Sequence, residues 1–562
     1  MSGLETAAPG PATPRPKKLH GRAFYESIGS PKYIVAPMVD QSEFAWRMLT
    51  RSFMPKSEQS NLLAYTPMLH ARLFGETQAY RDSHFQATRP GADAEPPTPW
   101  LDGNPAIDRP LFVQFCANEP AALLDAARRV APHCDAVDLN LGCPQGIAKK
   151  GRYGAFLQED QALIHRLIRT LHEELPVPVT AKIRILDTPE ATLAYARNVL
   201  DAGASILTVH GRRREQKGHL TGVADWAAIR RLRDELPPDT VLFANGNVLQ
   251  RGDVEACLAA TGADGVMSAE GNLSDPSIFA AEPSEGEEAG EMFTRGEYWR
   301  GVGGGVGGFR VDAVLRRYLD ILHRYVEGEE PPSRRPLFVP GDDEAWLAQP
   351  PPDPTAATET TITTITTTTA STTAKNGDQN GEAGEAGEGE EEEEGPARKK
   401  RKRNKANNDK KGGGADPEAI GKKDKVPSPN YIAVKGHLFH LLRHFVSRHT
   451  DVRDLLARAR LGPGYLPYLE RVLDMVERRV AGGLLEYERT GGRSFEDEPL
   501  PAVKVKQLPK ELTVQATETE DEGDEAAAAA AAEAAPGVAA TEAKVAELEK
   551  QTDYPTNDLV SG

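Results

Sequence analysis

The sequence predicts an α/β protein, a (β/α)8 barrel followed by a small helical domain. Eight short apolar runs alternate with amphipathic segments between residues 33 and 271, and two further helical patterns follow a low-complexity stretch. The expected strands are Tyr33–Ala36, Leu62–Tyr65, Leu111–Phe115, Ala136–Leu139, Val179–Ile183, Ile206–His210, Val241–Ala244 and Gly265–Ser268. Several runs are apolar at consecutive positions, as in strands covered on both faces. Eight strands, each followed by a helical segment, match a barrel. A doubly wound sheet stays open as the alternative.

The segments between the expected strands have helical periodicity. The one after the third strand has Asn118 as its expected N-cap and Pro120 in its first turn. Beyond about residue 275 the alternation stops, because 282–291 is acidic and 301–308 is rich in glycine. We expect an insertion or loop there, and a helical pattern resumes at Val311–Tyr325.

The second ordered unit has two apolar stripes at helical spacing. The stripes are formed by Leu438, Leu441, Leu442 and Phe445, and by Leu466, Leu469, Leu473 and Val476. Gly462, Pro463 and Gly464 lie between them. The expected organisation is a disordered arm at 1–30, a barrel at 31–330, a low-complexity linker at 331–428, a helical domain at 429–490 and a disordered acidic tail at 491–562.

The net charge of −17 does not exclude a nucleic-acid partner. Two acidic runs, at 388–394 and 518–525, hold twelve acids, and without them the charge is about −5. The four cysteines have no metal-ligand spacing and fit a reducing compartment. The N-terminus lacks the apolar core of a secretory signal, and no run of about 18 apolar residues predicts a membrane span. We therefore expect a soluble intracellular protein without a metal, and the sequence is compatible with a monomer.

Polar residues and glycines recur where the expected strands end, which is where barrel enzymes place their chemistry. These positions are Pro37-Met38, Gln114, Asn140 to Pro144, Lys182, His210, Asn245 to Asn247, and Ala269 to Gly271. Gly246 and Gly271 allow close approach of backbone N–H groups to a phosphate. Gln114, Lys182 and Asn245 could hydrogen-bond the polar edge of a flavin ring. A neutral Cys143 thiol on a tight loop is a plausible proton donor.

Four motifs together resemble the tRNA-dihydrouridine synthase family. They are Ala36-Pro37-Met38 with Phe44 and Arg47, the run Asp138 to Gly151 that reads DLNLGCPQGIAKKG, Val209-His210-Gly211-Arg212, and Asn245-Gly246-Asn247. The run around Cys143 is long and specific, and it is most similar to the eukaryotic branch that acts at positions 16 and 17 of the tRNA D-loop. The resemblance covers about residues 30–330 and, more weakly, about 430–490.

The resemblance implies reduction of uridine to 5,6-dihydrouridine with FMN, which NADPH or NADH would recharge. Cys143 would give the proton to C5, and reduced FMN would give the hydride to C6. The implied cofactor-binding residues are Ala36, Pro37, Met38, Gln114, Lys182, His210, Asn245, Gly246, Asn247, Ala269 and Glu270. The implied substrate-binding residues are Asn140, Lys149, Lys150, Arg184 and Arg212.

Glu270 departs from the family pattern, because many members carry Arg at this position. An acid beside a phosphate is unfavourable. We expect its side chain to point away, which leaves backbone N–H groups to bind the phosphate. Cys116, Cys134 and Cys257 are interpreted as structural.

Basic residues predict contact with the tRNA backbone in two places. Lys149, Lys150 and Arg152 follow Cys143 directly, where a solvated charge run is the alternative. In the helical domain the basic residues and interleaved histidines are Lys435, Arg443, Arg448, Arg453, Arg458, Arg460, His437, His440, His444 and His449. The cluster Lys399–Arg403 is compatible with a nuclear localisation signal or an RNA tether, so the expected location is cytoplasmic, nuclear or both.

Two other functions stay open at this point. One is an FMN barrel oxidoreductase for a small molecule, which would not need the basic helical domain. The other is a barrel that binds RNA without catalysis, which the combination of Cys143, Lys182 and His210 disfavours.

Overall fold

The computed structural model describes residues 18–89, 98–280, 309–349 and 428–491. The runs at 282–291 and 301–308, residues 350–427 with the basic cluster Lys399–Arg403, and the acidic tail lie outside the described residues. All described residues fall in one of the two units into which the chain divides.

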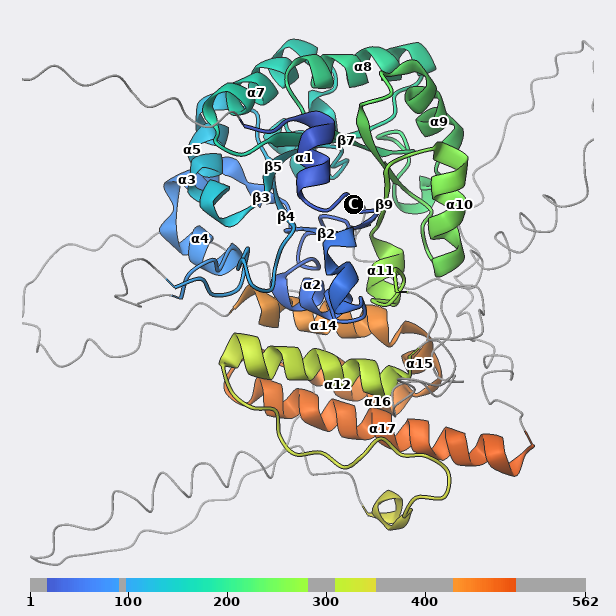
Figure 1. Cartoon of the computed structure of the whole chain (residues 1–562). Coiled ribbons are helices and arrows are strands. Elements are labelled where there is room, and N and C mark those ends of the chain that lie inside the picture. Colours follow the sequence, from blue (N-terminus) through green and yellow to red (C-terminus); the bar gives the residue numbers. More distant parts are fainter. Residues whose placement is uncertain (1–17, 90–97, 281–308, 350–427, 492–562) are drawn as a thin grey trace, which may run out of the picture. The chain divides into compact units, whose positions relative to one another are not determined.

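Eight parallel strands form a closed barrel (Figure 1). They are β1 (Tyr33–Val35), β2 (Leu62–Tyr65), β4 (Leu111–Cys116), β5 (Ala136–Leu141), β6 (Val179–Arg184), β7 (Ile206–His210), β8 (Val241–Asn245) and β9 (Gly265–Ser268). They are ordered β2-β1-β9-β8-β7-β6-β5-β4, and β4 pairs back with β2, which closes the ring. The predicted barrel is therefore confirmed and the doubly wound sheet is excluded. The short strand β3 (Leu69–His70) adds to the end of β4.

Helices surround the barrel, and all of them except α4 bury apolar side chains. They are α2 (Phe44–Arg51), α3 (Ala71–Glu76), α4 (Gln78–His84), α5 (Pro120–Val130), α7 (Gln161–Glu174), α8 (Pro189–Asp201), α9 (Trp226–Glu235) and α10 (Arg251–Thr261). Two short helices, α6 (Gly146–Gly151) and α11 (Glu270–Ser274), directly follow β5 and β9. The predicted cap of α5 was wrong: the Glu119 carboxylate accepts the first N–H groups, and Asn118 donates instead to the carbonyl of residue 151.

Helix α1 (Gly21–Ser27) covers the amino-terminal ends of the strands (Figure 1). Tyr25 Oη donates to the carbonyls of Pro31 and Asp264, which precede β1 and β9, at 3.3 and 3.1 Å. The Phe24 ring stacks on Phe112, with ring centroids 5.9 Å apart. Because this end is filled by side chains, a ligand can enter only at the carboxyl ends of the strands.

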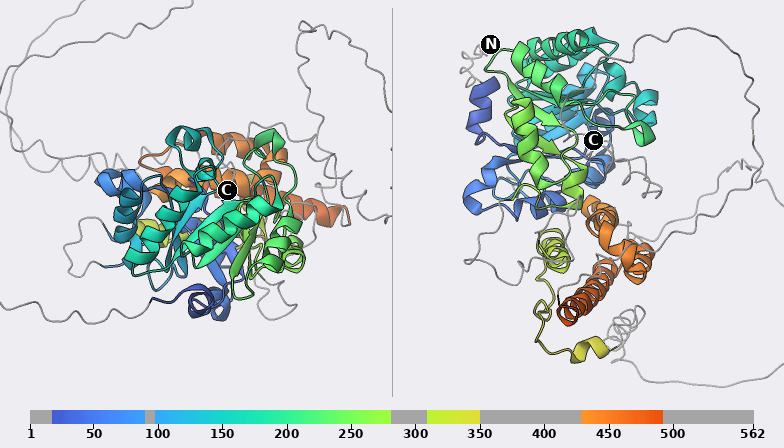
Figure 2. Two further views of the ribbon diagram at one scale, coloured as in Figure 1. Left: turned by 90° about the horizontal axis from the view of Figure 1, so that it is seen from above. Right: turned by 90° about the vertical axis from the view of Figure 1, so that its right-hand side faces the viewer.

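Helices from two parts of the sequence pack together beside α2. Helix α12 (Val311–Ile321) packs on α2 and on α17 (Tyr465–Arg489), which also contacts α16 (Thr450–Arg458). Helix α14 (Pro429–Leu441) packs on α2 and α11, and α15 (Arg443–Arg448) follows it. Figures 1 and 2 show α12 lying among these later helices. All eight side chains of the two predicted apolar stripes are buried.

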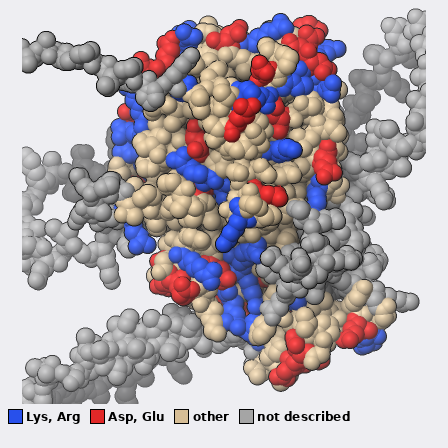
Figure 3. Space-filling model, viewed as in Figure 1, with Lys and Arg blue, Asp and Glu red and all other residues tan. Residues whose placement is uncertain are grey.

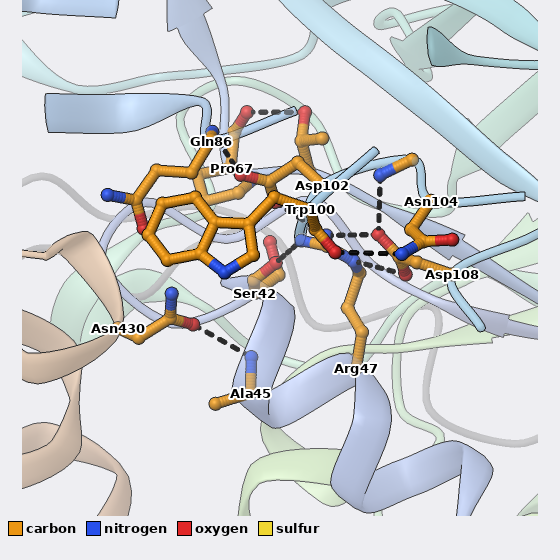
Figure 4. Close-up of polar contacts among 12 residues, drawn as sticks. Ser42, Ala45, Arg47, Pro67, Gln86, Trp100, Asp102, Asn104, Asp108 and Asn430 are labelled. Carbon is orange, nitrogen blue, oxygen red and sulfur yellow. Dashed lines mark hydrogen bonds and ion pairs between the residues drawn. The ribbon is translucent and has the colours of Figure 1, made fainter. Parts of the chain in front are cut away.

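Arg47 of α2 is the centre of a buried ion network (Figure 4). Its guanidinium donates to Asp108 at 2.6 and 3.1 Å and to Asp102 at 2.7 Å. Nearby, Asn430 Oδ1 of α14 accepts from the amide of Ala45 at 2.8 Å. These contacts fix α2 to the segment before β4 and to α14, so this signature residue lies in a structural network and not among the strand-end residues.

Candidate active site at the carboxyl ends of the strands

The residues that end neighbouring strands become neighbours in space, because all strands run in the same direction. The register pairs Gln114 with Asp138, Asn140 with Lys182, Arg184 with His210, and His210 with Asn245. The structure therefore brings together the predicted polar residues of β4 to β8 at the barrel end opposite α1.

A chain of buried hydrogen bonds begins at Asp138 and ends at the loop that carries Cys143. The Asp138 carboxylate accepts from Gln114 Nε2 at 2.8 Å and from Thr180 Oγ1 at 2.6 Å. Gln114 Oε1 accepts from Asn140 Nδ2 at 2.8 Å. Asn140 Oδ1 accepts from the amides of residues 142 and 143 at 3.1 and 2.9 Å. Since a carboxylate only accepts, it sets the orientation of both amide side chains, and Asn140 must present oxygen to the loop.

Three more contacts hold this loop, residues 142–145, which we call the Cys143 loop. Arg184 Nε donates to the carbonyl of residue 142 at 2.7 Å, and Lys217 Nζ donates to the carbonyl of residue 144 at 2.7 Å. The amide of Ala155 donates to the Cys143 carbonyl at 3.0 Å. Gly154 lies against the loop at φ +63°, where a Cβ would be 2.7 Å from the Cys143 carbonyl oxygen. The loop is thus fixed from β5, β6 and the segment after β7.

Cys143 is the only one of the four cysteines that is not buried. Desolvation raises the pKa of its thiol, against a hydrogen bond to the backbone of Gln145 and the charges of Arg184, Lys182 and Lys217. The thiol is therefore neutral at pH 7 and can donate a proton. The same three cations would stabilise the thiolate that remains.

Lys182 and Arg184 place buried positive charge at the end of β6. Lys182 is 4% exposed, and desolvation followed by the charge of Arg184 lowers its pKa to about 7. Desolvation and the neighbouring Arg212 lower the pKa of Arg184 to about 10. Buried cations that are this destabilised favour an anionic or electron-rich ligand.

His210 offers an unsatisfied buried donor at the same place. Desolvation and the charges of Arg184, Lys182 and Arg212 hold its pKa well below the ordinary value, so the ring is neutral. Its Nε2 is 3.2 Å from Arg212 Nη1, which can only donate, so Nε2 accepts and Nδ1 carries the hydrogen. Nδ1 is buried without a partner, as is Asn245 Oδ1, whose amide nitrogen donates to Met267 O at 3.0 Å. These two atoms could hydrogen-bond a ligand.

The segments after β8 and β9 approach each other closely. At Gly246, φ is +112° and a Cβ would be 2.7 Å from Ala224 Cβ, and at Gly271 a Cβ would be 2.4 Å from Val248 O. The Asn247 side chain is engaged, because its Oδ1 accepts from Arg212 and from the amide of Ala224. A phosphate here would therefore meet backbone N–H groups, including those that begin α11.

The remaining predicted residues lie around this set. Ala36, Pro37 and Met38 are buried after β1, and the amide of Ala36 donates to Ser268 O of β9 at 3.0 Å. Lys149 and Lys150 are exposed on α6. Ala269 is the N-cap of α11.

Glu270 turns to the helical part of the chain. Its Oε1 is 3.3 Å from Arg443 Nη1, and both side chains are about half exposed. The carboxylate therefore has a cationic partner in the helical part of the chain.

Asp138, Lys217 and Arg214 were not among the predicted site residues. Asp138 had a signal, because it is a charge between Val137 and Leu139 inside an apolar run. Lys217 and Arg214 lie in a long loop after β7 and had none, since only the fold brings Lys217 to the Cys143 loop and Arg214 to residues 155–159.

The predicted basic surface of the helical domain is partly wrong. His437 is fully buried: its Nδ1 is 2.5 Å from Tyr318 Oη and its Nε2 is 2.9 Å from Gln41 O. Lys435 Nζ donates to the carbonyl of residue 457 at 2.6 Å. Arg458 and Arg460 are exposed.

A cavity of about 400 Å³ lies between α2 and α12 and is lined by none of the strand-end residues. Its charged lining residues are Arg316, Arg317, Asp320 and Arg324. Figure 3 shows basic side chains gathered where α12 runs. Arg316 pairs with Glu477 and Asp320 with Arg334. Because this cavity is lined by none of the strand-end residues and two of its charged side chains are already paired, we place the candidate site at the carboxyl ends of the strands.

The described residues contain no group of three metal-ligating side chains. No helix in the described part of the chain is long and apolar enough to cross a membrane.

Comparison with known proteins gives one consistent family. The model of the dihydrouridine synthase (Dus) family matches residues 34–302. The chain is 51% identical over 313 residues to the tRNA-dihydrouridine(16/17) synthase of Saccharomyces cerevisiae, covering 56% of this chain and 65% of that protein. It is 56% identical over 263 residues to the enzyme of that name from Schizosaccharomyces pombe, and the match covers 47% of this chain and 61% of that protein. A tRNA-dihydrouridine(20a/20b) synthase-like protein of Homo sapiens is 34% identical over 250 residues, and the match covers 44% of this chain and 70% of that protein. The chain thus spans less than two thirds of the first two relatives.

Proposed function

The chain belongs to the dihydrouridine synthase family, and on that premise we propose that it reduces uridine in tRNA to 5,6-dihydrouridine with FMN and NAD(P)H. The substrate positions we propose are 16 and 17 of the D-loop, which the names of the S. cerevisiae and S. pombe relatives carry. The observation that carries the proposal is the Cys143 loop. A neutral thiol is held by a buried hydrogen-bond chain beside a barrel mouth lined with cations.

The strand-end residues fit FMN by the chemistry of their buried cations and of two unpaired polar atoms. Lys182, Arg184 and the orphan donor His210 Nδ1 suit the electron-rich N1–C2 edge of the ring, and Asn245 Oδ1 suits a hydrogen-bond donor. Backbone N–H groups after β8 and β9 suit the phosphate. FMN, when bound and reduced, would supply the hydride for C6 of the uridine.

In the proposed reaction, Cys143 completes the reduction by giving a proton to the second carbon of the double bond. The Sγ–H bond breaks and its proton joins C5, so one hydride and one proton saturate the C5=C6 bond. The thiolate left behind is stabilised by Arg184, Lys182 and Lys217, and it regains a proton from solvent.

A uridine in folded RNA must leave its stack to reach this site. The exposed Lys149 and Lys150 on α6 lie beside the Cys143 loop, where they could contact phosphates of the RNA. A small-molecule oxidoreductase would have no use for them.

An absorption spectrum of the purified protein, followed by NADPH addition with and without unmodified tRNA, tests the proposal. We expect flavin bands that bleach with NADPH and recover under anaerobic conditions only when tRNA is added. Recovery with a small enone or quinone but not with tRNA would favour a small-molecule oxidoreductase. No flavin bands after an attempt to load FMN would favour an RNA-binding barrel without catalysis.

A further inference from the structure

Three exposed apolar side chains lie on two loops at the mouth of the barrel. Eight large apolar side chains are exposed in the part of the chain that the structure describes, and three of them are Ile147, Leu220 and Val223. Ile147 is 68% exposed on α6, four residues after Cys143, and Leu220 and Val223 are 62% and 68% exposed between β7 and α9. We call these three side chains the apolar rim.

The two loops that carry the apolar rim are tied to each other. Lys217 Nζ donates to the carbonyl of residue 144. Arg214 pairs with Glu159, donates to the carbonyl of Ala155 at 3.3 Å, and lies over the Phe156 ring at 5.1 Å. Arg184 bridges the carbonyls of residues 142 and 213 at 2.7 and 3.2 Å. Because the loops are fixed together by these contacts, the apolar rim belongs to one surface next to the reactive thiol.

The charges on this surface indicate which partner the apolar rim meets. Lys149, Lys150, Arg152 and Arg213 are exposed on the same two loops. Arg213 pairs with Asp187 at 3.3 Å. A hydrophobic protein partner would offer no counterpart to the other three cations, whereas an RNA offers phosphates for them and base faces for the apolar side chains.

Extrusion of a base creates the apolar surface that such a rim could cover. When a uridine leaves its stack, the faces of the adjacent bases become exposed to water, and proteins that deform nucleic acids commonly insert an aliphatic side chain at such a step. We propose that Ile147, together with Leu220 and Val223, packs on the bases next to the extruded uridine and so holds the RNA in its open form. The inference rests on the proposed function and names the part of the chain that contacts the neighbours of the target base.

The test compares folded and unstructured RNA in the FMN-loaded, full-length protein. Ile147→Ala and the double variant Leu220→Ala/Val223→Ala should each lower kcat/KM for folded tRNA about ten-fold, because aliphatic area on the rim is no longer buried by the RNA. Ile147→Leu should retain most activity. Leu19→Ala is the matched control, since Leu19 is 49% exposed before α1 at the opposite end of the barrel.

A short unstructured oligonucleotide that contains uridine has no stack to open. Single-turnover reoxidation of the reduced flavin by saturating oligonucleotide should therefore be equal in wild type and in the rim variants, as should flavin reduction by NADPH. Equal losses of activity on tRNA and on the oligonucleotide would overturn the inference, because the rim would then act only through the Cys143 loop. Unchanged activity of the rim variants on tRNA would also overturn it. If neither RNA reoxidises the wild-type flavin, the proposed function itself is wrong.

Discussion

Replacement of Lys182 by methionine should stabilise the flavin-free protein at neutral pH. The ammonium is buried at the end of β6 with Arg184 beside it, and desolvation is the main reason that its pKa falls to about 7. A lysine in the unfolded chain titrates near 10.4. Between pH 7 and about 10.4, residue 182 therefore holds its proton in the unfolded chain but loses it in the folded protein. The free energy of unfolding of the wild type rises with pH across this range.

The size of the effect follows from the difference in pKa. Each unit of pKa difference corresponds to about 1.36 kcal/mol, and the difference is about 3.5 units. Because half of the folded molecules still carry the proton at pH 7, Lys182 lowers the free energy of unfolding at this pH by about 4 kcal/mol. Asp138 loses a favourable neighbour in the variant, because the charge of Lys182 opposes the rise of the Asp138 pKa to about 6. We therefore expect Lys182→Met to gain about 2–4 kcal/mol at pH 7, and the gain should vanish near pH 10.

Urea unfolding of flavin-free protein at pH 7, 8.5 and 10 measures this gain. Lys150→Met, an exposed lysine of α6, is the control and should change the free energy of unfolding by less than about 0.5 kcal/mol. FMN should protect the variant less than the wild type, because the ligand no longer relieves a buried charge. The reasoning is refuted if Lys182→Met destabilises the flavin-free protein at pH 7, or if its effect is the same at all three pH values.

Three further variants test the site and the fold. Cys143→Ala should keep flavin content and tRNA affinity but slow reoxidation of the reduced flavin by tRNA at least about 100-fold, as a stopped-flow trace would measure. Asn140→Ala frees the amides of residues 142 and 143, so it should lower kcat about 100-fold with little change in KM; a change in KM alone would contradict the positioning role. Arg47→Met leaves the buried Asp108 with only the more distant Arg51, at 3.9 Å, as a cationic partner and should lower the free energy of unfolding in urea by about 3–5 kcal/mol, whereas Arg129→Ala, in an exposed pair, should lower it by less than about 1 kcal/mol.

The barrel could be predicted because each strand is buried on both faces and therefore appears as an apolar run. All eight predicted strands are present, with bounds that differ by at most two residues. The sequence also predicted a candidate site at the carboxyl ends of the strands, because the ends of parallel strands meet. The pairing of β2 with β4 follows from the predicted barrel, but the addition of the short strand β3 to the end of β4 could not be predicted, because it depends on the tertiary fold.

The hydrogen-bond chain from Asp138 to the Cys143 loop needs the register of β4 and β5. Gln114 and Asn140 are separated by 26 residues, and the pairing of Gln114 with Asp138 places the Gln114 amide between the Asp138 carboxylate and the Asn140 amide. The sequence indicated polar residues at the strand ends, but which of them form hydrogen bonds with one another depends on the tertiary structure.

The helical part of the chain is not a removable module, contrary to what its separation by a long linker suggested. His437 lies between Tyr318 and Gln41, and Val434 and Leu438 belong to the same buried cluster as the barrel. A deletion of residues 430–490 would expose this cluster, so loss of activity would carry no information about RNA. Substitution of exposed residues such as Arg458 and Arg460 is the informative experiment.

Glu270 explains why a departure from a family pattern is hard to interpret from sequence alone. An acid next to a phosphate-binding segment is unfavourable when considered by itself, and the sequence could say only that its side chain must turn away. The structure supplies the partner, Arg443, from 173 residues further along the chain. The pair brings an arginine from the helical part of the chain next to the segment that follows β9. Because the two residues are so far apart in the sequence, the partner of Glu270 depends on the tertiary fold and could not be identified from the sequence.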